Sequence, residues 1–99
     1  MILIPVLKNN RDITELKEKL EEEKIELEKE IDSFEKCRNE ENAGNIVEEA
    51  LDVIQVAVGV VDIILENYPK ETREKFKEHL PKLHNRGWRF KKILSIEES

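Results

Sequence analysis

Turn-forming and aromatic residues are scarce in this chain of 99 residues. It contains three glycines, three prolines and only 5% aromatic residues. A many-stranded β fold needs frequent turns, so this composition argues against an all-β domain. The single cysteine, Cys37, excludes an intrachain disulfide framework and fits a reducing, cytoplasmic location.

Long hydrophobic runs and positive charge are also lacking. No stretch of about 18 uncharged apolar residues is present, which predicts no membrane span. The apolar N-terminal run lacks a preceding basic region and is interrupted by Pro5, so it does not resemble a signal peptide. The net charge of −6 argues against nucleic acid as a partner, because binding it requires a basic face that neutralises phosphates.

Charged residues make up 40% of the chain. The apolar residues that lie between them follow helical spacing. We therefore expect one all-α domain over residues 1–99, a bundle of three to four helices built on a long antiparallel pair. The chain should begin with an irregular arm (1–11), followed by a first helix (13–37) capped by Asp12 and a polar break (38–45). A second helix should begin near residue 43 or 46, with Asn42 or Asn45 as its cap, and end at residue 67. A third helix (70–85) stopped by Gly87, a short fourth helix (88–96) and a frayed tail (93–99) should follow.

The first helix has an apolar stripe with one gap. At the position of the missing apolar residue the sequence carries Glu23, with Glu26 at the edge of the stripe. The stripe consists of Ile13, Leu16, Leu20, Leu27, Ile31 and Phe34. A charged residue in such a stripe indicates either a position exposed to water or a site that needs a carboxylate.

The second helix is apolar over most of its circumference, which indicates that a further subunit covers part of it. Its polar residues fall in one narrow strip, with Glu49 at the border. The strip consists of Glu48, Asp52, Gln55, Gly59, Asp62 and Glu66. One interpretation is that the strip faces water; the other is that it faces the gap at Glu23.

In the second interpretation, two pairs of carboxylates face each other. Glu23 with Glu26, and Glu49 with Asp52, are each three residues apart and therefore neighbours on a helix. The two pairs are level only if the hairpin turns near residues 37–38. Such a cluster requires cations, and a site made of carboxylate oxygens suits Mg²⁺ or Mn²⁺.

These two segments resemble the motifs of the all-α, MazG-like nucleoside triphosphate pyrophosphohydrolases. KLEEEKIELEKEI (Lys19–Ile31) resembles their E-x-x-E motif and IVEEALDVIQ (Ile46–Gln55) resembles their E-x-x-D motif. KLHNRGWRFKK (Lys82–Lys92) resembles the end of small MazG-like proteins, some of them phage-encoded. The chain departs from the pattern in the high charge of its first motif and in its short length.

The resemblance implies a Mg²⁺-dependent hydrolase that cuts a nucleoside or deoxynucleoside triphosphate between the α and β phosphates. Glu23, Glu26, Glu49 and Asp52 would be the metal ligands, and a homodimer or homotetramer would be the assembly. Glu48 is then the candidate for the base that accepts a proton from the attacking water.

The segment from His79 to Lys92 is the one basic stretch of the chain. Lys82, Arg86 and Arg89 are candidates for phosphate contacts and Trp88 for stacking on a base. The same residues also suit a structural role, with the cations paired to the acidic surface of the first helix and Trp88 as an anchor in the core or at a subunit contact. An alternative for the whole chain is a non-catalytic helical oligomerisation or adaptor protein, or an inactive relative of the family.

Overall fold

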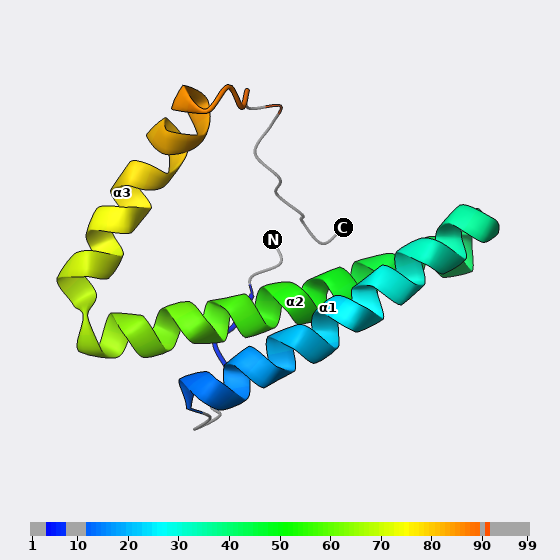
Figure 1. Ribbon diagram of the computed structural model, residues 1–99, viewed down its shortest axis with the longest axis horizontal. Helices are drawn as coiled ribbons and strands as arrows, with labels where there is room; N and C mark the ends of the chain where they lie inside the picture. Colours follow the sequence, from blue (N-terminus) through cyan, green and yellow to red (C-terminus); the bar gives the residue numbers. More distant parts are fainter. Residues whose placement is uncertain (1–3, 8–11, 90, 92–99) are drawn as a thin grey trace, which may run out of the picture. The chain divides into compact units, whose positions relative to one another are not determined.

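Residues 4–7, 12–89 and 91 are described by the computed structural model, and among them there are three α-helices and no strand (Figure 1). The helices are α1 (Ile13–Lys36), α2 (Glu40–Asn67) and α3 (Pro69–Asn85). The all-α prediction is confirmed. The chain divides into two compact units: Val6–Ile63 contains α1 and most of α2, and the other contains the end of α2 and α3.

The start of α1 follows the predicted cap. The carboxylate of Asp12 accepts a hydrogen bond from the backbone N–H of Glu15 at 2.9 Å, and its carbonyl accepts one from the N–H of Leu16 at 3.1 Å. These contacts satisfy N–H groups that a helix otherwise leaves without an intrahelical partner. α1 ends at Lys36, where the backbone of Cys37 turns to an extended conformation.

The connection between α1 and α2 is shorter than the sequence predicts. α2 begins at Glu40, so the break comprises residues 37–39 instead of 38–45. The predicted caps, Asn42 and Asn45, are wrong: the side-chain oxygen of Asn39 accepts from the N–H of Asn42 at 2.7 Å. Glu40 and Glu41 then fall in the first turn, where the helix dipole favours negative charge. A break at residues 37–39 agrees with the turn near residues 37–38 that a level arrangement of the two carboxylate pairs requires.

In the first unit, α1 and α2 lie side by side and antiparallel (Figure 1). The expected long helix pair is therefore present. Its core is thin: the buried hydrophobic residues among those described are Leu16 and Val56, which are 9% and 8% exposed. Gly59 of α2 faces Leu16, because a Cβ added at Gly59 would lie 3.7 Å from a methyl group of Leu16.

The predicted apolar stripe of α1 is only partly turned towards α2. Leu16 is buried, but Ile13, Leu20 and Ile31 are 45%, 38% and 38% exposed. The buried face is centred on Leu16 and Glu23, which are seven residues apart, and at about 100° per residue the three exposed side chains lie to one side of it. The carboxylate in the gap is thus closer to the centre of the interface than its apolar neighbours.

In the second unit, α3 begins and ends where the sequence predicts. Pro69 occupies the first helical position, and the N–H groups of Gly87 and Trp88 donate to the carbonyls of His84 and Leu83, each at 3.0 Å. Gly87 has φ of +92°, which a residue without a side chain adopts readily. This is a Schellman motif. No helix continues through Trp88, Arg89 or Lys91, and the rest of the expected fourth helix, the end of the tail and most of the arm lie outside the described residues.

Candidate metal centre

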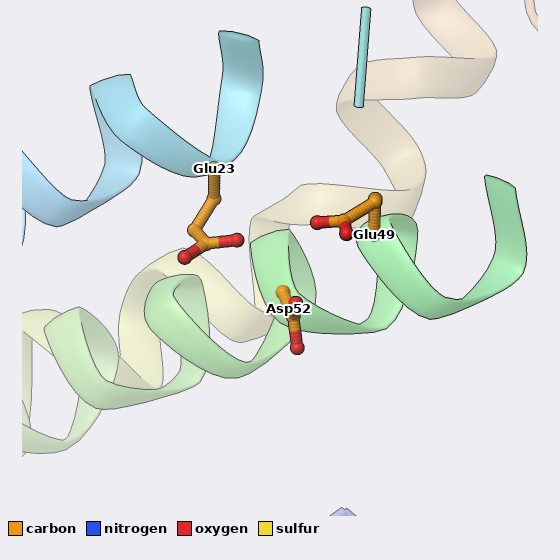
Figure 2. A group of neighbouring side chains, drawn as sticks. All are labelled: Glu23, Glu49 and Asp52. Carbon is orange, nitrogen blue, oxygen red and sulfur yellow. The ribbon is translucent and has the colours of Figure 1, made fainter. Parts of the chain in front are cut away.

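Three carboxylates meet between α1 and α2. Glu23 comes from α1, and Glu49 and Asp52 come from α2, with one oxygen of each lying within 4.8 Å of the other two. Figure 2 shows the carboxylate of Glu49 directed towards that of Glu23. The i, i+3 spacing on α2 and the early turn after Lys36 together place these groups at one level of the hairpin.

Glu23 is the buried member of this acidic triad. The residue is 8% exposed, in an interface where an apolar side chain is expected. Its carboxylate is 2.8 Å from the ammonium group of Lys19, one turn earlier on α1. Sequence reasoning missed Lys19 as a part of this site. The signal for it was the i, i+4 spacing to Glu23, which is typical of helical ion pairs.

Glu49 is a member of the triad whose pKa is perturbed. It is half-buried, and burial, followed by the negative charges of Asp52 and Glu23, raises the pKa of its carboxyl group above the ordinary value. Negative charge so concentrated favours either proton uptake or a cation. Asp52, by contrast, is exposed and leaves the cluster open to solvent on its side.

The other two predicted acidic residues lie at the edge of the triad. Glu26 is exposed and pairs with Lys29 at 3.5 Å, and Glu48 is also exposed. Both lie close enough for their charges to contribute to the raised pKa of Glu49. Neither Glu26 nor Glu48 belongs to the group of oxygens that meets at the triad.

A cavity of about 340 Å³ opens beside the triad in the same unit. Asp52, Gln55 and Asp62 of the polar strip line it, together with Lys19 and Glu23 from α1. The strip therefore borders a space shared with the gap residue Glu23, as the second interpretation of the sequence expects. The buried pair Leu16 and Val56 forms part of its apolar wall.

The four predicted substrate contacts belong to the other unit. Lys82, Arg86 and Arg89 are exposed, and Trp88 is 65% exposed, which does not fit a packing anchor within the described chain. The guanidinium of Arg89 donates to the carbonyls of His84 and Trp88 at 3.1 and 3.0 Å, so it stabilises the end of α3. A role of these four residues in substrate binding stays a prediction.

The triad suits a hard divalent cation. Its donors are all carboxylate oxygens, the ligands that Mg²⁺ and Mn²⁺ prefer, and the open side at Asp52 leaves room for water or phosphate. Neither histidine nor cysteine takes part in the described cluster, which argues against a zinc site of the structural type.

Comparison with known proteins adds no assignment. The chain matches no family model, no curated protein and no solved structure. Within the described part of the chain, no helix is both long and apolar enough to cross a membrane.

Proposed function

We propose that the protein is a Mg²⁺-dependent pyrophosphohydrolase that converts a nucleoside or deoxynucleoside triphosphate and water to the monophosphate and pyrophosphate. The observation that carries this proposal is the buried carboxylate of Glu23, which meets Glu49 and Asp52 across the helix pair. A buried carboxylate beside two others destabilises a small core even when one cation, Lys19, is paired with Glu23, so its presence supports a functional requirement.

In this proposal Glu23, Glu49 and Asp52 hold the cation, and Glu26 at the edge completes or supports the set. A divalent ion there, Mg²⁺ or Mn²⁺, would polarise the phosphate oxygens and lower the pKa of a bound water. Glu48, exposed beside the triad, is the candidate that takes the water's proton. Lys82, Arg86, Trp88 and Arg89 remain proposed contacts for phosphate and base, on the grounds of their charge and exposure.

The direct test is pyrophosphate release from a panel of canonical and modified nucleoside triphosphates, with Mg²⁺, with Mn²⁺ and with neither. Asp52→Asn should abolish metal-dependent release. Asp32→Asn is the matched control, because Asp32 is an exposed aspartate of α1 outside the triad. If no triphosphate of the panel is cleaved, or if Asp52→Asn and Asp32→Asn behave alike, the proposal is wrong.

An exposed apolar stripe on α2 favours self-association. Self-association is compatible with the enzyme and also with the alternative function, a non-catalytic oligomerisation or adaptor protein. Val47, Leu51, Ile54 and Val61 are 58%, 50%, 41% and 41% exposed, and with Val58 they follow the alternating four- and three-residue spacing of a helix-pairing seam. We propose a homodimer or homotetramer formed through this stripe, because apolar side chains in such a row gain from burial against a second copy.

A further inference from the structure

The cavity beside the triad has the size of a small-molecule site. Its volume of about 340 Å³ lies within the range of ordinary ligand pockets, at the lower end. Glu23 and Asp52 belong both to the cavity and to the triad, so a ligand in this space would lie beside the carboxylates. Carboxylates alone would repel an anionic ligand there.

Lys19 is the only cationic residue among the described residues that line this cavity. Its ammonium is 2.8 Å from an oxygen of Glu23 and 3.5 Å from one of Glu22. The side chain is long and 37% exposed, so its ammonium can turn from Glu23 towards the cavity. The Lys19 ammonium, a monovalent cation, is paired with the same carboxylate that a divalent ion would need as a ligand.

We propose that Lys19 exchanges partners: it neutralises Glu23 in the metal-free protein and pairs with a phosphate group in the cavity once the triad holds a divalent cation. This inference rests on the proposed function, since it requires a metal at the triad and a phosphate-bearing ligand beside it. The physical reason is charge. A divalent cation on Glu23 repels the ammonium, and a phosphate in the cavity offers it a stronger anionic partner.

The exchange predicts effects of opposite sign when the ammonium is removed. Lys19→Met should bind Mn²⁺ more tightly than the unaltered protein, because the competing cation is gone. With Mn²⁺ saturating, it should bind inorganic tripolyphosphate roughly tenfold more weakly, as expected for the loss of one charge-assisted contact. Lys19→Arg keeps the charge and should retain most of the tripolyphosphate binding.

Lys24→Met is the matched control for isothermal titration of both ligands. Lys24 also lies on α1 and pairs with a glutamate four residues on, Glu28, at 3.8 Å, but it does not line the cavity. It should change both affinities by less than about twofold, the effect of a screened surface charge. Circular dichroism of each variant establishes that the helices are retained.

The outcomes separate the two proposals. If the unaltered protein binds no Mn²⁺, the metal centre and this inference both fail. If it binds Mn²⁺ but Lys19→Met weakens that binding, or affects tripolyphosphate no more than Lys24→Met does, the partner exchange is wrong while the metal centre stands. Tighter Mn²⁺ binding together with weaker tripolyphosphate binding, specific to Lys19→Met, is the result that supports it.

Discussion

Replacing Glu23 with methionine should make the metal-free protein more stable. The residue is 8% exposed in an interface whose other buried members are apolar, so methionine would occupy a position already removed from water. Burying such a side chain contributes about 1.5–3 kcal/mol. The ion pair with Lys19 that is lost is partly buried, and replacing the carboxylate of such a pair by an apolar side chain costs little here because the Lys19 side chain is 37% exposed and its ammonium can reach water. We expect a net gain of about 1–2 kcal/mol in the free energy of unfolding.

The same substitution should remove the response to metal. A cation that binds only the folded state stabilises it by about 2.7 kcal/mol at a hundredfold excess over its Kd. The order of stabilities should therefore invert: Glu23→Met is the more stable protein in EDTA, and the unaltered protein is the more stable one with Mn²⁺. Without metal, the melting temperature should rise by about 5–10 °C for a chain of this size.

Thermal and urea unfolding, each with EDTA and with Mn²⁺, measure both effects. Glu22→Met is the control, because the side chain of Glu22 is 68% exposed on the same helix. It should change the free energy of unfolding by no more than about 0.5 kcal/mol in either buffer. If Glu23→Met is instead destabilised by about 1 kcal/mol or more without metal, Glu23 is a structural ion-pair residue and the argument from its burial is wrong.

Further predictions concern pH, backbone and assembly. The pKa of Glu49 is raised in the folded protein, so its carboxyl group contributes stability that is present below the ordinary pKa of 4.5 and is lost as the pH rises through the folded-state pKa. Between pH 4.5 and neutrality, Glu49→Gln should therefore lose less stability than the unaltered protein, as measured by urea unfolding. Gly44→Ala, where an added Cβ meets nothing within 4 Å, should stabilise α2 by about 0.5–1 kcal/mol, whereas Gly87→Ala, at φ of +92°, should destabilise the end of α3 by roughly 1 kcal/mol, both measured by thermal unfolding. Ile54→Lys should dissociate the proposed oligomer in sedimentation equilibrium. Ile25→Lys, which alters an isoleucine of similar exposure on α1, should leave the oligomer intact. Equal masses for the two variants would contradict the α2 stripe as the interface.

Local rules account for most of what the sequence predicted correctly. Helical spacing predicted the three helices, and short-range chemistry predicted the cap at Asp12, the start of α3 at Pro69 and the stop at Gly87. These features depend on contacts within about one helical turn, so a single sequence contains the information for them. The gap in the stripe at Glu23 likewise identified a residue that proved to be buried.

The cap at Asn39 and the rotation of α1 were beyond local reasoning. Asparagine at 39, 42 and 45 all suit a cap, so residue type alone did not select among them, and the structure uses Asn39. That choice moved the turn to residues 37–39 and brought Glu23 opposite Glu49 and Asp52. Packing likewise turned Leu16 and Glu23 inward and left Ile13 and Leu20 at the surface.

The sequence by itself determined the helices, their approximate ends and the presence of carboxylates at helical-neighbour spacing, because these follow from short-range backbone and side-chain chemistry. Only the tertiary structure decided which of those carboxylates meet and that a cavity adjoins them. The reason is that contacts between α1 and α2 depend on the rotation and register of two helices, which residues far apart in the chain set together.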